Sequence, residues 1–504
     1  MGLLGAEDGG DRRSDAAPTC ACAAAMPSIV DAPATADSRA RLDRAVDGLG
    51  AWRPDLSAGT PTQVNRGFIA AVAAVVALVL LGVAGERLDA ALAVLLAFPF
   101  FVSACVRLGA LAPLIAAPRD AEPPTHRLPD DDLPPYTILV PLYREVGVAP
   151  QIVDAIAKLD YPVAKLQVLV VVEACDPETA AAVARYGLPR HMRLVVVPPG
   201  APRTKPRALN YARAEATGDF LVVYDAEDVP EPDQLRRAVA AFARDPRIGC
   251  LQARLNIYEP DKNWLTRQFT MEYSSLFDAL LPTIVRLGWP VPLGGTSNHF
   301  PRHVIEACGG WDSYNVTEDA DLGVRLARFG WRVGVLASTT WEEAPATWRV
   351  WLGQRTRWVK GWMQTWLVHS RHPVRLLRDL GLWSFAGFQL WSAAVLVSAL
   401  VHPWLFAMTL WHVGTGGLHA PTSGLWWLAL FNLGAGYASA MALGRTAVAR
   451  RKLPLGASAW TLPLYWIAIS IAAHRALVEL VTAPFHWEKT EHQGCPTGQS
   501  TSQT

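Results

Sequence analysis

Long apolar stretches near both ends of the chain constrain its fold more than any other feature. The residues from Phe68 to Ala84 carry no charge, and a second apolar stretch follows from Ala90 to Val106 and extends toward Ala117. About 18–20 apolar residues are needed to span the hydrocarbon core of a bilayer. We therefore predict two transmembrane helices within residues 63–117. A buried hairpin of a soluble protein is the alternative.

Three further apolar segments occupy the C-terminal part of the chain, at Trp383–Trp411, Gly424–Gly444 and Ala459–Ala473. The first is long and contains Pro403, so it forms either one tilted span or a broken pair of spans. We therefore predict a transmembrane region of three or four spans over residues 376–485, followed by a tail at 486–504. Aromatic side chains near the segment ends fit an interfacial belt, namely Trp404, Trp411, Trp426, Trp427, Trp460 and Tyr465.

The charges between the last two segments predict the orientation. Four basic residues lie there, and by the positive-inside rule that loop is cytoplasmic (Arg445, Arg450, Arg451 and Lys452). Two N-terminal spans place the N-terminus and the central region on one side, which we predict to be the cytoplasm. Three C-terminal spans then place the tail at 486–504 outside. A fourth span would place the tail inside, but a broken first segment would also move the basic loop outside.

Composition supports a membrane protein with a soluble insert. Only 18% of residues are charged while 51% are hydrophobic, and the mean hydropathy is +0.17. The net charge of +1 gives no basic field for a nucleic-acid partner. Residues 1–62 are rich in small and polar residues without a periodic pattern, so we predict a disordered tail. Residues 118–134 are rich in Pro and Asp and are predicted to be a linker.

The central region, predicted as a domain at 135–375, alternates between two patterns. Short β-branched runs predict strands at Thr137–Val140, Val168–Val172, Leu194–Val197 and Phe220–Tyr224. Helical spacing of apolar residues separates them, at Ala149–Leu159, Pro177–Tyr186 and Lys205–Ala216. This alternation indicates an α/β fold with a mostly parallel sheet covered on both faces. In such sheets ligands bind at the carboxyl ends of the strands.

Acidic residues follow two of these strands. Asp225-Ala226-Glu227-Asp228 comes directly after the fourth strand, and buried acids need partners. Hard oxygen ligands suit Mg²⁺ or Mn²⁺ with a diphosphate, whereas the alternative is a solvated acidic turn. Glu173 and Asp176 follow the second strand. They contact a nucleotide or cap the next helix, and capping is the better interpretation for Asp176.

Two motifs lie further along the chain. Thr317-Glu318-Asp319 supplies either a general base for an acceptor hydroxyl or a capping arrangement for the following helix. In Gln354-Arg355-Thr356-Arg357-Trp358, the first, fourth and fifth residues share one helix face. The fork of Arg357 suits a diphosphate and the ring of Trp358 suits a sugar. A membrane-surface helix is the alternative, given three neighbouring tryptophans (Trp351, Trp362 and Trp366).

In this order the motifs resemble the family 2 glycosyltransferases of the membrane-integrated, cellulose-synthase-like kind. TED (317–319) and QRTRW (354–358) match that family intact. The segments PLYRE (141–145), TKPRALNYA (204–212) and LGGTSNHF (293–300) are similar to bacterial exopolysaccharide synthases. The chain departs from the family in reading D-A-E at 225–227, Glu173-Ala174 at the first-acid position, and Gly294 where cellulose synthases often have cysteine. No gating-loop motif is evident in the C-terminal spans.

The resemblance implies a GT-A-type α/β domain combined with an α-helical transmembrane bundle. It implies a catalytic role for Asp319 with Glu318, and a Mg²⁺ or Mn²⁺ ion held by Asp225 and Glu227. The implied contacts to the nucleotide sugar are Glu173, Lys205, Asp225, Gln354 and Arg357. The implied contacts to the acceptor are Gly295, Thr296 and Trp358.

The implied activity is an inverting, metal-dependent hexosyl transfer. A UDP-linked sugar would be added to a growing β-linked exopolysaccharide, coupled to its export. The alternatives are single addition to a lipid-linked acceptor, as in a glycolipid synthase, and an inactive membrane scaffold. The implied partners are the sugar donor, the polysaccharide or lipid-linked acceptor, the lipid bilayer, and an export or regulatory subunit. The implied location is the bacterial inner membrane with the catalytic domain in the cytoplasm.

Overall fold

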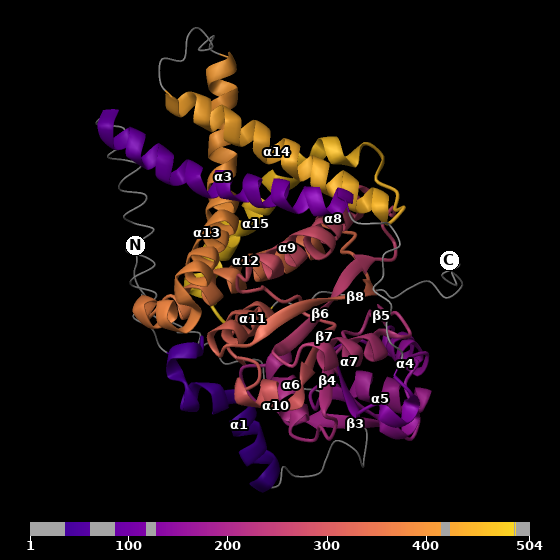
Figure 1. Cartoon of the computed structure of the whole chain (residues 1–504). Helices are drawn as coiled ribbons and strands as arrows, with labels where there is room; N and C mark the ends of the chain where they lie inside the picture. Colours follow the sequence, from indigo (N-terminus) through magenta and orange to yellow (C-terminus); the bar gives the residue numbers. More distant parts are fainter. Residues whose placement is uncertain (1–35, 61–85, 117–127, 415–423, 488, 490–504) are drawn as a thin grey trace, which may run out of the picture.

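The computed structural model describes residues 36–60, 86–116, 128–414, 424–487 and 489 (Figure 1). A sheet-containing domain occupies one end of the molecule in this view, and a group of long helices occupies the other. The predicted span at Phe68–Ala84 and most of the predicted linker at 118–134 lie outside the described residues.

The sheet has eight strands in the order β3-β2-β1-β4-β7-β6-β8-β5. Strands β3, β2, β1 and β4 run parallel, whereas β7 is antiparallel to both β4 and β6. The predicted parallel half is confirmed, and the mixed second half was not predicted. The strands are β1 (Tyr136–Leu142), β2 (Leu166–Glu173), β3 (Met192–Val197), β4 (Phe220–Val223), β5 (Val229–Pro230), β6 (Ile248–Ile257), β7 (Asn298–Pro301) and β8 (Arg332–Glu342).

Helices cover both faces of the parallel half. Ile138 and Val140 of β1 belong to a core with α4, α5 and α7, whereas Leu139 between them packs into a core with α6. Alternate residues of one strand therefore bury on opposite faces, which explains the continuous apolar runs. The helices are α4 (Ala149–Ala157), α5 (Pro177–Tyr186), α6 (Lys205–Arg213) and α7 (Gln234–Arg244).

Five further helices complete the domain, and some of them contact the long helices. Among them α12 lies between the domain and the long helices (Figure 1) and packs against α15, α13 and α11. Trp351 of α12 is fully buried, so the alternative of a membrane-surface helix is wrong at this position. The elements are α8 (Trp264–Ser275), α9 (Leu281–Leu287), α10 (Arg302–Ala307), α11 (Glu318–Arg328) and α12 (Trp348–His369).

The long helices are α3 (Glu86–Ala116), α13 (Pro373–Gly414), α14 (Gly424–Arg450) and α15 (Leu462–Thr482). The last three coincide with the predicted C-terminal apolar segments. Three described segments are long and apolar enough to cross a membrane: Phe98–Ala116, Pro373–Trp404 and Gly456–Thr482. Tyr465 is not part of an aromatic belt, because it is 1% exposed and bonds to Glu272 instead.

Residues 36–60 are not disordered, contrary to the prediction for the N-terminal tail. Helix α1 (Ala36–Trp52) packs against α6, where Asn210 Nδ2 donates to the carbonyl of Ala45 at 3.0 Å. Beyond the helix, Ser57 Oγ donates to Asp312 Oδ1 at 3.0 Å. These anchors are mostly polar and the helix buries only Ala45 and Leu49, so the sequence carries little periodic apolar signal for it.

Candidate active site

Three charged side chains converge at the carboxyl end of the parallel strands. Lys205 Nζ lies 2.5 Å from Asp225 Oδ1 and donates to the carbonyl of Gly295 at 2.6 Å. A Cβ built on Gly295 would lie 3.5 Å from Asp319 Oδ2, 3.8 Å from Lys205 Nζ and 3.9 Å from Asp225 Oδ2. The chain therefore brings two carboxylates and an ammonium group, which are far apart in sequence, around one glycine.

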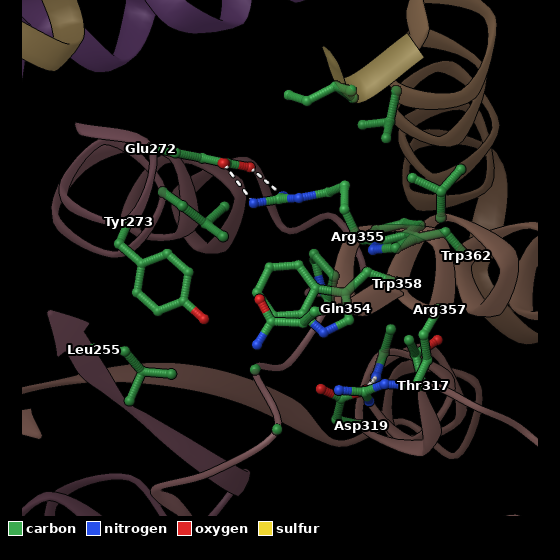
Figure 2. Close-up of a pocket in the computed structure, with 18 of the residues that line it drawn as sticks. Leu255, Glu272, Tyr273, Thr317, Asp319, Gln354, Arg355, Arg357, Trp358 and Trp362 are labelled. Atoms are coloured by element: carbon green, nitrogen blue, oxygen red, sulfur yellow. Dashed lines mark hydrogen bonds and ion pairs between the residues drawn. The ribbon is translucent and has the colours of Figure 1, made fainter. Parts of the chain in front are cut away.

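These groups form part of the wall of a cavity of about 510 Å³. Every predicted site residue lines it, and the cavity continues between α3, α13, α14 and α15. In the close-up of Figure 2, Arg357 and Asp319 lie together at one side, Glu272 and Tyr273 lie at the other, and Trp358 lies between the two pairs. The residues predicted from sequence are Glu173, Lys205, Asp225, Glu227, Gly295, Thr296, Glu318, Asp319, Gln354, Arg357 and Trp358.

The acidic turn after β4 is a compact buried structure and not a solvated loop. Asp228 is fully buried, and its Oδ2 accepts hydrogen bonds from the Asp225 amide at 2.7 Å and from Thr296 Oγ1. Thr296 thus holds the turn in place, whereas the resemblance implied an acceptor contact. Burial and the charge of Asp225 raise the pKa of Glu227 to about 8.

The carboxylates of this turn and its neighbours are the candidate ligands of the predicted metal ion. Burial, together with neighbouring carboxylates, also raises the pKa values of Asp228 and Glu342. This excess of buried negative charge fits a divalent cation. Within the described residues no group of three or more His, Cys, Asp or Glu side chains is arranged to hold a metal. Two carboxylates such as Asp225 and Glu227 would hold an ion only with oxygens supplied by a substrate.

The TED segment begins helix α11. Asp319 Oδ1 accepts from the amide of Ala320 at 2.8 Å. Burial raises the pKa of Asp319, while the charges of Lys205 and Arg357 act to lower it. Burial and the charge of Asp319 raise the pKa of Glu318 to about 7. The capping alternative is not observed, because the Thr317 side chain makes no capping hydrogen bond.

The two arginines of QRTRW diverge. Arg357 faces Asp319 (Figure 2), and its Cζ lies 5.4 Å from the ring centroid of Trp487. Arg355 instead donates to both carboxylate oxygens of Glu272, at 2.6 and 2.8 Å. Trp358 stacks on Tyr273 with ring centroids 6.2 Å apart. The shared face of Gln354, Arg357 and Trp358 was predicted, but the ion pair of Arg355 was not.

Glu173 differs from its predicted role. Its carboxylate pairs with the fully buried Arg207, whose other nitrogen donates to the carbonyl of Gly200. Glu173 therefore anchors α6, which begins at Lys205, and is not free to grip a ribose or base. Asp176 caps α5 as predicted, since its Oδ1 accepts from the amide of Thr179 at 3.3 Å.

The segment after α15 was missed as part of the site. Trp487 and Lys489 line the cavity, and Lys489 pairs with Glu145. Lys360 of α12 fixes this segment by donating to the carbonyl of Ala483 at 3.1 Å and to that of His486 at 2.9 Å. We predicted that the tail at 486–504 lies on the opposite side of the membrane from the central domain. Since Trp487 and Lys489 contact that domain, the prediction is wrong for these residues. The parity of three C-terminal spans led to that prediction, whereas Lys489 pairs with Glu145 of the sheet-containing domain.

Comparisons with known proteins identify the domain. Residues 134–361 match the family described as "Glycosyltransferase like family 2". The chain is 31% identical over 235 residues to "Probable glycosyltransferase YdaM" of Bacillus subtilis, covering 46% of this chain and 56% of that protein. It is 31% identical over 293 residues to "Beta-monoglucosyldiacylglycerol synthase" of Synechocystis, covering 56% of this chain and 60% of that protein.

Two further comparisons concern a synthase and the fold. The chain is 28% identical over 264 residues to "Cellulose synthase 1" of Komagataeibacter xylinus, covering 49% of this chain and 16% of that protein. A mannosyltransferase from Pyrobaculum calidifontis, solved with GDP-Man and Mn²⁺, has a similar fold. The TM-score is 0.50 at 22% identity, covering 78% of this chain and 98% of that one. The chain spans less than two thirds of the curated relatives named first.

The mixed sheet, with helices on both faces and charged residues at the carboxyl ends of its parallel strands, defines a GT-A-type domain. More particularly, residues 134–361 are a glycosyltransferase domain of family 2.

Proposed function

We propose that the protein is an inverting hexosyltransferase that uses a nucleotide-diphosphate sugar, taken to be UDP-linked. The observation that carries the proposal is the convergence of Lys205, Asp225 and Asp319 around Gly295 at the strand ends. A scaffold without activity has no physical need for two carboxylates and an ammonium group on the wall of one cavity.

In the proposed reaction, Asp319 accepts the proton of an acceptor hydroxyl. The hydroxyl oxygen bonds to C1 of the sugar, the bond from C1 to the phosphate oxygen breaks, and the nucleoside diphosphate leaves with that electron pair. One displacement inverts the anomeric centre, so an α-linked donor gives a β-linked product. A positioned general base contributes about 10²–10⁴ in rate.

Cationic side chains neutralise the leaving group. Lys205 and Arg357 both reach the end of the cavity that holds Asp319, and their positive charges lower its pKa. We assign both to the diphosphate, with Gln354 at the edge of the same site. Trp358, stacked on Tyr273, offers its ring to the acceptor sugar. Asp225 and Glu227 would hold Mg²⁺ or Mn²⁺, which supplies further neutralisation of the diphosphate when bound.

The shape of the cavity favours a long acceptor that reaches the membrane. Because it extends from Asp319 to the long helices, a growing β-linked exopolysaccharide could leave the site toward the membrane as it is built. A hydrophilic chain cannot cross about 30 Å of hydrocarbon unaided, so we propose export coupled to synthesis at the bacterial inner membrane. Further proposed partners are the bilayer and an export or regulatory subunit.

A lipid-linked acceptor is the second candidate. It is favoured by the similarity to a glycolipid synthase, which covers a larger share of this chain than the similarity to a cellulose synthase does. A lipid entering between the long helices would reach Asp319 through the same cavity. The two candidates differ in the length and the solubility of the product.

The experiment uses the full chain in nanodiscs with Mg²⁺ or Mn²⁺ and radiolabelled UDP- and GDP-sugars, with GDP-Man included because the solved structure of similar fold holds it. We compare wild type with Asp319→Asn and with the matched control Asp131→Asn, a residue that is exposed and does not line the cavity. We expect nucleotide release and labelled product from wild type and Asp131→Asn but not from Asp319→Asn.

The product decides between the acceptors. High-molecular-weight label supports the exopolysaccharide, and a short label extracted into organic solvent supports the glycolipid. Equal product from Asp319→Asn would overturn the assigned base. No release from any donor by folded protein would overturn the proposed activity.

A further inference from the structure

The helix-lined end of the cavity contains a cation that the proposed reaction does not use. Arg107 lies in the middle of Phe98–Ala116, one of the segments apolar enough to cross a membrane, and it lines the cavity. Charged side chains inside such segments are rare and mark functional sites. Among the acidic residues of the described chain that line the cavity, Glu272 of α8 is paired with Arg355 and bonded to Tyr465 of α15. The others line the part of the cavity formed by the sheet-containing domain.

Four side chains form a linked group here, one from each long helix. The guanidinium Cζ of Arg107 lies 5.1 Å from the ring centroid of Trp466 in α15. Trp466 stacks on Tyr437 of α14 with centroids 4.9 Å apart, and Tyr437 hydrogen-bonds to His402 of α13. Aromatic stacking of a guanidinium fixes the plane of its donors.

Arg107 is half-buried and differs in its partners from two other arginines, Arg355 and Arg451. No hydrogen bond or ion pair joins it to another described residue, whereas Arg355 pairs with Glu272 and Arg451 pairs with Asp278. A guanidinium away from water that lacks an anion is costly. The described residues offer Arg107 no carboxylate partner. A negatively charged group of a ligand would therefore stabilise its guanidinium.

Other hydrogen-bonding groups on the same wall also lack partners. The indole nitrogen of Trp391, the hydroxyl of Ser398 and Nδ1 of His402 are buried without a hydrogen-bond partner among the described residues. All three residues line the cavity. Together with Arg107 of α3, these side chains of α13 offer donors from two helices to a polar ligand. They do so in a part of the molecule where ordinary packing would favour apolar side chains.

We propose that Arg107, together with Ser398 and His402, which lie one helical turn apart on α13, binds an anionic group of the acceptor, a phosphate or a carboxylate. The inference rests on the proposed function, and it names the acceptor's chemistry. The donor diphosphate is assigned to Lys205 and Arg357 at the opposite end, so the anion at Arg107 belongs to the other substrate. A phosphate would come from a lipid-linked acceptor, and a carboxylate would come from an acidic sugar of a polysaccharide.

The test measures binding without any reaction. The full chain in a neutral maltoside detergent is mixed with decyl phosphate, decyl β-glucuronide or the neutral decyl β-glucoside, and bound ligand is measured by native mass spectrometry. We expect wild type to retain one anionic ligand with roughly tenfold or greater preference over the neutral one, as a charge-assisted contact implies. Arg107→Gln should abolish that preference, and Arg107→Lys should retain part of it.

A matched control uses another arginine of the long helices. Arg445 in α14 is exposed and does not line the cavity, so Arg445→Gln should bind like wild type. Preference for decyl phosphate would support the lipid-linked source, and preference for decyl glucuronide would support the acidic polysaccharide. Equal binding of charged and neutral ligands by wild type, or an unchanged preference in folded Arg107→Gln, would overturn the proposal.

The outcome is independent of catalysis. Binding of a UDP-hexose is measured in the same samples, and Arg107→Gln should leave it unchanged. If no nucleotide sugar binds any variant, the proposed function fails while the anion measurement still stands. If nucleotide binding is intact and the anionic preference is absent, the inference about Arg107 fails while the proposed function stands.

Discussion

Gly361 of α12 lies directly against Thr317, the residue before α11. A Cβ built on Gly361 would lie 2.2 Å from Thr317 Oγ1 and 2.5 Å from its Cγ2. Helix α12 carries Arg357, and α11 begins with Glu318 and Asp319. Because no side chain separates the two helices here, the absence of a Cβ at Gly361 fixes how closely Arg357 approaches Asp319.

Substitution of Gly361 by alanine should therefore displace α12 from the TED segment. We expect a loss of roughly 1–3 kcal/mol in stability, as for an overpacked core, and a loss of transfer activity larger than unfolding explains. Thermal unfolding and nucleotide release measure the two effects. Gly48→Ala is the control, since nothing lies within 4 Å of a Cβ at that position. Wild-type melting and activity in Gly361→Ala would contradict the assignment.

Gly295 gives the opposite expectation. A Cβ there would meet Asp319, Lys205 and Asp225 only at ordinary contact distances of 3.5–3.9 Å, so Gly295→Ala should fold like wild type. The added methyl group would occupy the space where the three charged groups converge. We expect transfer to fall by about tenfold to a hundredfold, because small misplacements of reacting groups have effects of this size. A melting temperature equal to wild type, with reduced kcat/KM, is the result expected.

Substitution of the two arginines of QRTRW should have different effects on the free energy of unfolding. Arg355→Gln removes the ion-pair partner of Glu272, which keeps only the hydrogen bond from Tyr465. Breaking a buried pair costs about 3–5 kcal/mol. We expect roughly 2–3 kcal/mol here, because the Glu272 side chain is 32% exposed. Arg357→Gln should retain the wild-type melting temperature and show strongly reduced but measurable transfer.

A double variant provides the control for that pair. Replacing both Arg355 and Glu272 by glutamine removes both charges, so it should recover part of the stability lost in Arg355→Gln alone. Additive losses in the double variant would show that the ion pair contributes nothing to stability. Arg355 would then act through packing on Trp358, since Arg355 Cζ lies 4.6 Å from the centroid of the Trp358 ring.

The sequence predicted those parts of the site that follow from local periodicity. Strand ends placed Asp225 and Glu227, and helical spacing placed Gln354, Arg357 and Trp358 on one face. The pairing of Glu173 with Arg207 was not predictable in this way, because it depends on how α6 packs against β2. The carboxylate of Glu173 looked like a nucleotide contact until the buried guanidinium beside it was known.

The missed elements share a physical cause. Helix α1 and the segment at Trp487 and Lys489 are held largely by polar contacts to distant residues, such as Asn210 with Ala45 and Lys489 with Glu145. Such contacts leave no apolar periodicity in the sequence. The mixed half of the sheet was missed for a related reason, since the position of β7 between β4 and β6 depends on pairing over long distances in sequence.

The pH dependence of transfer should follow the ionisation of Asp319. Burial raises its pKa, and the base must be deprotonated to accept the acceptor's proton, so activity should rise with pH through a value above the ordinary aspartate pKa of about 3.9. The charge of Arg357 lowers this pKa, so Arg357→Gln should move the acid limb of kcat/KM to higher pH. Arg349→Gln, an exposed change on the same helix, should leave the limb in place.

Stability should depend on pH in the opposite sense. A carboxyl group whose pKa is raised by folding stabilises the native state below its unfolded pKa, and this contribution is lost as pH rises through the folded value. Asp319→Asn removes the titrating group but can keep the hydrogen bond from the amide of Ala320. It should therefore melt at a higher temperature than wild type at pH 8 and close to wild type at pH 4. If the difference in melting temperature between Asp319→Asn and wild type is the same at both pH values, the pKa of Asp319 is not raised by folding. The acid limb of kcat/KM could then not be assigned to a raised pKa of Asp319.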